Sequence, residues 1–167
     1  MEDFTYDLDQ VNRITASAIG NPGERVFYIQ ARRGREIISL IAEKEQVRAL
    51  AQHVDQFLEE LTEKNPLLSS PDDFMLISDM SLEEPLESRF RIAQMGLKYD
   101  AEHDLIILII QGLDEEDETP TARFSASREQ MKALSLHALQ VVSKGRRICG
   151  NCARPIDPEG HFCPRMN

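Results

Sequence analysis

The sequence predicts an α+β fold made of two βββα units, whose antiparallel strands form one or two sheets covered by two helices, followed by a small C-terminal zinc knuckle. Three observations predict this fold: two amphipathic helical stretches, three strand-like segments before each of them, and three cysteines confined to residues 149–167. A chain of 167 residues can bury one core of this kind and carry a small appendage.

The first predicted unit spans about residues 13–64. Residues 13–19 and 26–31 are expected to be strands joined by a turn at 21–23, and a hairpin tip at Arg33-Gly34 leads to a third strand at 36–41. A helix follows, because apolar residues recur three and four positions apart along one face. This stripe consists of Val47, Leu50, Ala51, Val54, Phe57, Leu58 and Leu61.

The second predicted unit spans residues 89–145, with strands at 89–99, 104–111 and 121–125. Its acidic loop at 114–118 is expected to be solvated, and a divalent-cation site there is the less favoured alternative. Ser127 and Gln130 have the spacing of a capping box, which predicts that the second helix begins after Ser127. Gly145 is expected to end that helix.

A short internal match suggests that the two units are copies. Segments 45–53 and 129–137 align without a gap, five of their nine residues are identical, and the helical stripes share the same offset. Residues 65–88 contain three prolines, as linkers do, but the apolar residues at 74–77 predict that this connector packs on the surface. The predicted organisation is therefore a duplicated body at 1–145 and a knuckle at 146–167.

The composition indicates an acidic folded protein, with a formal net charge of −10 and 41% hydrophobic residues. This charge argues against nucleic-acid binding over the whole surface. The N-terminus shows no signal sequence, and the longest apolar run, at 105–110, is far shorter than the roughly 20 residues of a membrane-spanning helix. We therefore expect a soluble, cytoplasmic protein.

Four residues near the C-terminus are expected to bind one structural zinc ion. Cys149 and Cys152 form a CxxC pair, and His161 and Cys163 lie two residues apart, so each pair can present both ligands on one side. Four protein ligands leave no open position for water, which favours a structural ion over a catalytic one, and no thioredoxin-like pattern supports a redox role. The metal is expected to stabilise a module too small to bury a core.

Two surface features indicate contacts with other molecules. Leu136 and Leu139 lie away from the apolar stripe of the second helix, so we expect the zinc knuckle, the connector or another subunit to cover them. Basic residues, among them Arg146 and Arg147, outnumber acidic ones at 144–167. They could contact a phosphate backbone or an acidic protein, although contact with the acidic body of this chain is the simpler explanation.

No catalytic set is apparent in the sequence, which contains no P-loop, GxGxxG or GxSxG motif. His53 and His137 recur at matching helix positions, and we interpret them as structural residues rather than as a metal or acid–base pair. Arg32, Arg33 and Arg35 surround a hairpin tip; a basic turn is the favoured interpretation and anion binding the alternative.

Three stretches carry a resemblance to known proteins: residues 6–16, the run Gly-x-Arg-x-Phe-Tyr-Ile-Gln-Ala at 23–31, and the ending Asp-Pro-Glu-Gly-His-x-Cys-Pro at 157–164. Together they resemble a bacterial family catalogued as domain of unknown function 3090, over essentially the whole chain. The resemblance implies a cytoplasmic protein with no established activity and supplies no catalytic residues. It also implies a kinase-like signalling partner, because such proteins are encoded beside a lipid-kinase-like protein.

These observations favour a non-catalytic, zinc-containing binding or adaptor protein that contacts a partner protein through Leu136, Leu139 and the knuckle. One alternative is a nucleic-acid-binding module, which would lose its retention on nucleic acid when Arg146 and Arg147 are neutralised. The other is an enzyme with a site between the repeats, for which a buried carboxylate or histidine in that pocket would argue.

Overall fold

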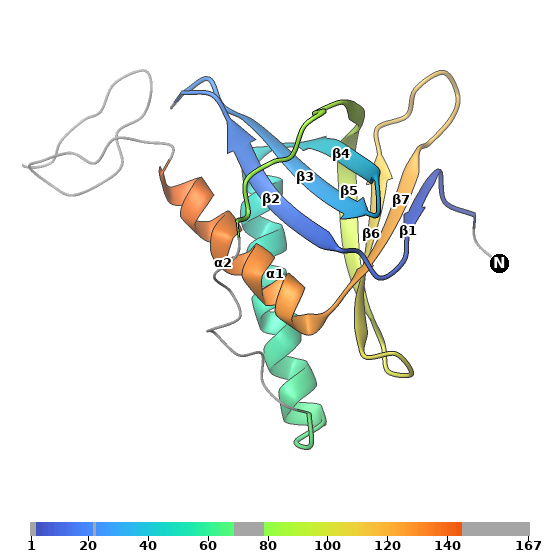
Figure 1. The fold of residues 1–167 in the computed structure, drawn as a ribbon, viewed down its shortest axis with the longest axis vertical. Coiled ribbons are helices and arrows are strands. Elements are labelled where there is room, and N and C mark those ends of the chain that lie inside the picture. Colours follow the sequence, from blue (N-terminus) through green and yellow to red (C-terminus); the bar gives the residue numbers. More distant parts are fainter. Residues whose placement is uncertain (1–2, 22, 69–78, 145–167) are drawn as a thin grey trace, which may run out of the picture.

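The computed structural model describes residues 3–21, 23–68 and 79–144, which form seven strands and two helices (Figure 1). In chain order the elements are β1 (Tyr6–Leu8), β2 (Arg13–Ile19), β3 (Val26–Arg33), β4 (Glu36–Ala42), α1 (Lys44–Lys64), β5 (Ser88–Asp100), β6 (Leu105–Gly112), β7 (Thr121–Ala126) and α2 (Arg128–Lys144). The helices lie beside each other, and their buried residues join those of the strands in one hydrophobic core.

All of the described strands belong to one mixed sheet with the order β1-β7-β6-β5-β4-β3-β2. Neighbouring strands are antiparallel except at two places, where β1 pairs with β7 and β4 pairs with β5 in parallel. The chain reaches β5 from β4 through α1, as a parallel pair requires a long crossover connection.

The predicted fold class is wrong in how it arranges these strands. It assumed duplicated βββα units with antiparallel sheets, whereas the strands form one mixed sheet that contains an unpredicted strand, β1, and two parallel pairs. The match between the helices has a local reason: Gln46 and Gln130 each cap a first turn, and amphipathic helices share apolar spacing. The predicted zinc knuckle at 146–167 lies outside the described residues.

The positions of the six predicted strands are confirmed to within two residues at each end. The predicted hairpin tip is also found, and Gly34 has a φ of 60° there, a conformation that glycine adopts without a steric penalty. The acidic loop at 114–118 is exposed, as expected. Strand β1 was missed because its three residues are too few to show an alternating pattern.

The segment between β1 and β2 brings the two ends of the sheet together. The Val11 amide donates a hydrogen bond to the Ser125 carbonyl at the end of β7 (2.9 Å), and the Asn12 amide donates to the Arg32 carbonyl on β3 (2.8 Å). Since β7 and β3 lie near opposite ends of the strand order, the sheet curls around its core. This curl places the start of β2 beside the start of α2 (Figure 1).

The two helices pack against each other through small and polar side chains. The Ser135 hydroxyl donates to the Ala51 carbonyl (2.9 Å), and the Lys132 ammonium group lies 2.8 Å from an Asp55 carboxylate oxygen. The first contact is buried and the second only partly so. Together they fix α2 between α1 and β2, which positions the cavity described next.

Candidate functional site

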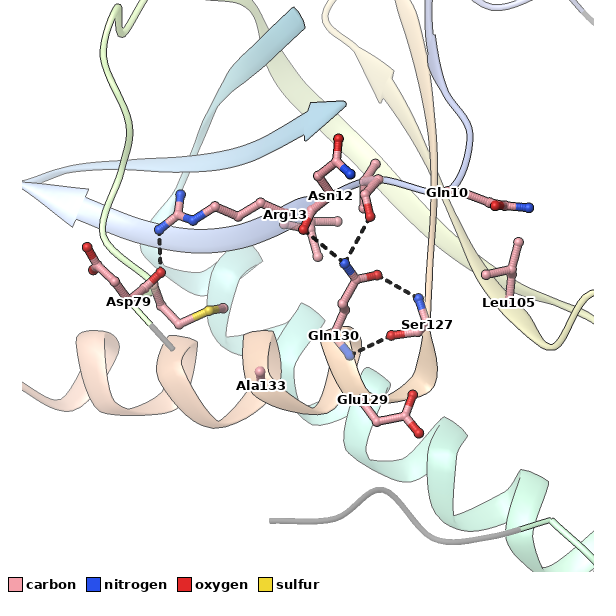
Figure 2. A pocket seen from close by; sticks show the side chains of 12 residues that line it. Gln10, Asn12, Arg13, Asp79, Leu105, Ser127, Glu129, Gln130 and Ala133 are labelled. Carbon is pink, nitrogen blue, oxygen red and sulfur yellow. Dashed lines mark hydrogen bonds between the residues drawn. The ribbon is translucent and has the colours of Figure 1, made fainter. Parts of the chain in front are cut away.

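The candidate site contains a cavity of about 660 Å³ at the seam between β2 and α2 (Figure 2). Its walls are the end of the β1–β2 segment, the start of β2, the first two turns of α2 and two residues that precede β5, Asp79 and Met80. The lining residues are Gln10, Val11, Asn12, Arg13, Ile14, Asp79, Met80, Leu105, Ser127, Glu129, Gln130 and Ala133.

The first turn of α2 forms one wall and is tied to the strand opposite. The Ser127 amide donates to the Gln130 side-chain oxygen (2.8 Å), and the Gln130 amide donates to the Ser127 hydroxyl (3.0 Å), so the predicted capping box is confirmed. The Gln130 side-chain nitrogen reaches across the seam and donates to the carbonyls of Val11 (2.9 Å) and Asn12 (3.3 Å). Figure 2 shows these bonds converging on Gln130.

Asp79 and Met80 form the opposite wall, and side chains of β2 hold residues 79–83 in place. Arg13 donates to the carbonyls of Asp79 (2.5 Å) and Ser81, and its guanidinium group also lies 3.2 Å from a Glu83 carboxylate oxygen. The Thr15 hydroxyl donates to the Met80 carbonyl (2.6 Å) in a buried hydrogen bond. These bonds direct Met80 inward, where only 9% of its surface remains exposed.

Behind the cavity, a buried arginine anchors the start of α2. The Arg128 guanidinium group, only 5% exposed, donates twice to the Asp104 carboxylate (2.8 and 3.0 Å), and the Tyr99 hydroxyl donates to the same carboxylate (2.7 Å). The Arg128 hydrogen bond holds the pKa of Asp104 below its ordinary value. In turn, the ion pair fixes the angle at which α2 leaves β7.

The chemistry of the cavity favours binding of an apolar group. Val11, Ile14, Met80 and Ala133 are buried apolar residues of its wall. The side-chain amide of Gln130 is already committed to hydrogen bonds within the protein, as is the guanidinium group of the adjacent Arg13. A mostly apolar cavity can accept a hydrocarbon side chain, and the groups of Gln130 and Arg13 keep their hydrogen bonds when it does so.

The wall formed by α2 continues into an exposed apolar surface. Glu129, Ala133 and Leu136 are spaced four and three residues apart, so they share one strip of the helix that runs from the cavity outward. Leu136 and Leu139 remain 38% and 37% exposed. We call these two leucines the α2 surface; the knuckle at 146–167 and residues 69–78 of the connector, which were expected to cover it, lie outside the described residues.

The remaining residues singled out from the sequence do not join this cavity. The His137 ring lies 3.2 Å from the buried Ser17 hydroxyl, while His53 is on α1 in an edge contact with Phe57, so the histidines do not form a pair. Arg32 contacts Glu83 (3.0 Å). The predicted zinc ligands Cys149, Cys152, His161 and Cys163, together with Arg146 and Arg147, lie outside the described residues.

Sequence reasoning missed the residues that join the walls of the cavity. The capping spacing identified Gln130, but nothing in the local pattern indicated that its amide would reach the carbonyls of Val11 and Asn12. Arg13 appeared only as the first residue of a strand. Its three contacts with residues 79–83 join positions that are more than sixty residues apart in the sequence, so no local pattern indicates them.

A second group of polar residues occurs at the turn between β5 and β6. The ligand atoms of Asp100, Glu102 and His103 lie within 4.8 Å of one another. The His103 ring pairs with the Asp100 carboxylate at 2.8 Å, which raises the pKa of the histidine. This exposed pairing accounts for the arrangement without a metal ion.

The fold and the cavity together define a mixed α+β protein with a mostly apolar cavity at the start of α2. The chain belongs to the family described as a protein of unknown function (DUF3090), whose model matches residues 6–163. No curated protein and no solved structure matches the chain. No helix in the described part of the chain has the length and apolar character needed to cross a membrane.

Proposed function

We propose that this protein is a non-catalytic binding or adaptor protein of the cytoplasm, and that it contacts a partner protein through the cavity and the α2 surface. The observation that carries the proposal is the continuity of these two features. A mostly apolar cavity, in which Gln130 and Arg13 are already hydrogen-bonded within the protein, opens beside Ala133. The same strip of α2 carries the exposed Leu136. A protein partner can use both at once, with one anchor side chain in the cavity.

Energetics support this use of the two features. Full burial of an exposed leucine side chain stabilises a complex by roughly 1.5–3 kcal/mol, and covering the 38% of Leu136 that remains exposed contributes a fraction of that. Anchor side chains in desolvated pockets dominate protein–protein affinity. We propose that the C-terminal module, held by zinc at Cys149, Cys152, His161 and Cys163, contributes further contacts, since it directly follows α2. The zinc ion has a structural role in this proposal.

Site-specific photocrosslinking in the native cell tests the proposal. A photoreactive amino acid replaces Leu136, and a matched control replaces Glu59, an exposed residue of α1. We expect one discrete protein adduct at Leu136, with a yield at least about tenfold above that at Glu59. Ala133→Phe, which places a ring in the cavity, is expected to reduce this adduct while leaving the circular dichroism spectrum unchanged.

Two results would contradict the proposal. Equal yields of the protein adduct at Leu136 and Glu59 would show that the partner does not bind specifically at the α2 surface. Crosslinks to nucleic acid in place of protein would instead support the alternative that the chain binds nucleic acid through its basic C-terminal residues.

A further inference from the structure

Strand β5 has an edge that its neighbour covers only in part. β5 is thirteen residues long, but β4 pairs with it only as far as Arg91. From Gln94 to Asp100, β5 pairs with β6 on one side, and no described strand pairs with it on the other. An uncovered edge presents main-chain donors and acceptors in the spacing that another extended chain can match.

Helix α1 turns this edge into a groove. α1 begins two residues after β4 ends and runs alongside the lower half of β5 (Figure 1). A cavity of about 180 Å³ lies between them, enough for one large side chain. Its lining residues are Gln46, Ala49, Leu50 and His53 from α1 and Ala93, Gln94, Met95, Gly96 and Leu97 from β5.

At the start of the groove, the Gln46 side chain bonds to β5 where the pairing of β4 with β5 has ended. The Gln46 side-chain nitrogen donates to the carbonyls of Ile92 (3.0 Å) and Ala93 (3.4 Å), directly beyond the last pair between β4 and β5. Gln46 therefore continues the hydrogen bonding of β4 for one step. Past Ala93, no described strand pairs with this edge.

The residues that line the groove indicate which side chains a bound segment should have. Leu50 is buried, and Met95 and Leu97 are partly buried against the core, so a side chain that enters meets apolar surface. The lining contains no carboxylate although the whole chain has a net charge of −10. The His53 ring has no hydrogen-bond partner among the described residues and makes an edge contact with the Phe57 ring. A carboxylate opposite His53 would complement this site.

We propose that the groove between α1 and β5 binds an extended segment of a partner protein, which adds a strand to residues 94–97 of β5. The segment inserts an apolar side chain between Ala49 and Leu97 and carries an acidic residue opposite His53. Strand addition of this kind draws affinity from main-chain hydrogen bonds and specificity from the side-chain pocket. The groove does not include Leu136 or Leu139, so this inference goes beyond the proposed function.

The test uses a library of random seven-residue peptides displayed on phage and selected against the full chain. We expect enriched peptides to alternate apolar and polar residues and to contain an acidic residue at a fixed position. Binding of a synthetic enriched peptide should slow hydrogen exchange at the main-chain amides of residues 94–98. An enriched peptide that binds without protecting β5 would overturn the proposal.

Matched variants on the exposed surface of α1 make the test specific. Ala49→Trp fills the groove and should weaken peptide binding about tenfold or more, whereas Gln52→Trp, which lies outside the lining, should not change it. His53→Gln should weaken acidic peptides but not their neutral analogues. Peptide binding that is insensitive to Ala49→Trp, or dimers of this chain that Ala49→Trp dissociates, would overturn the assignment to a partner segment.

Discussion

His137 is a half-buried histidine whose surroundings disfavour the protonated, charged form of the ring. Its ring faces the Ser17 hydroxyl at 3.2 Å, on the side of α2 that packs toward β2. Burial lowers the pKa of His137, and the cations Lys144 and Arg13 lower it further, while Asp79 opposes them. The neutral ring is therefore the form that the fold stabilises.

The first prediction concerns the pH dependence of stability. Because the folded-state pKa of His137 lies below the unfolded value of 6.5, the unfolded state binds more protons below that pH. The stabilisation from neutral His137 is complete above pH 6.5 and is lost as the pH falls from 6.5 toward the folded pKa. His137→Gln keeps a polar partner for Ser17 but cannot titrate. It should lose less unfolding free energy than the wild type between about pH 7.5 and 5.5 in urea titrations.

His103 provides a control of opposite sign. Its pKa is raised by the Asp100 carboxylate, so its contribution is present below pH 6.5 and is lost as the pH rises through the folded pKa. His103→Gln should therefore steepen the loss of stability toward acid, by a small amount because the pair with Asp100 is exposed. An identical pH dependence in the wild type and in His137→Gln would contradict the account of His137.

Among the secondary-structure elements, α1 and α2 each have a glutamine in the first turn that both caps the helix and binds a neighbouring strand segment. Gln46 and Gln130 both accept a hydrogen bond from the amide three residues earlier, at Glu43 and Ser127 (2.8 Å each). Each also donates to strand carbonyls, Gln46 to β5 and Gln130 to the residues at the start of β2. Helix capping is thereby coupled to the packing of helix on sheet, which a capping residue exposed to water would not achieve.

The second prediction is that Gln130→Ala destabilises the protein by about 1–3 kcal/mol. The variant loses the cap and leaves the Val11 carbonyl without its side-chain partner. Urea unfolding monitored by circular dichroism measures the change, and Gln140→Ala, an exposed position on the same helix, should stay within about 0.5 kcal/mol of the wild type. Equal stability of the two variants would show that the contacts across the seam contribute nothing.

For the molecule as a whole, we expect the body and the C-terminal module to differ in what stabilises them. The described residues bury a continuous core that extends through the sheet and both helices. The module has few apolar residues and four predicted ligands, Cys149, Cys152, His161 and Cys163, so its stability should come from the metal. All three cysteines of the chain belong to this set, which makes thiol chemistry a specific probe of the module.

The third prediction is that the purified protein carries about one zinc ion per chain, because the set can complete one tetrahedral site. Metal analysis after reconstitution measures the stoichiometry. Cys152→Ser should reduce bound zinc well below one per chain, while Ser143→Ala, on the exposed side of α2, should leave it unchanged. Zinc retained in full by Cys152→Ser, or substoichiometric zinc in the wild type, would contradict the prediction.

The local features of this protein could be predicted from its amino-acid sequence. Alternation and turn residues placed six strands to within two residues, helical spacing placed both helices, and the Ser127–Gln130 spacing placed the start of α2. Each of these features follows from interactions between residues close together in the chain, so their pattern is visible in a short window. The reliance on short segments also explains why the predicted duplication was wrong. The starts of the two helices match in sequence, but the strands form one mixed sheet instead of two repeated units.

The order of the strands and the positions of the candidate sites could not be predicted in this way, because they depend on contacts between distant parts of the chain. The parallel pairing of β1 with β7 joins residues more than one hundred positions apart, and the cavity needs Arg13 to meet Asp79 and Gln130 to meet Val11. Many pairings would satisfy the same local patterns, and the one adopted is the one that closes a single core without leaving a buried side-chain polar atom unpaired among the described residues. That choice depends on the free energy of the whole assembly of strands and helices, which no short segment contains.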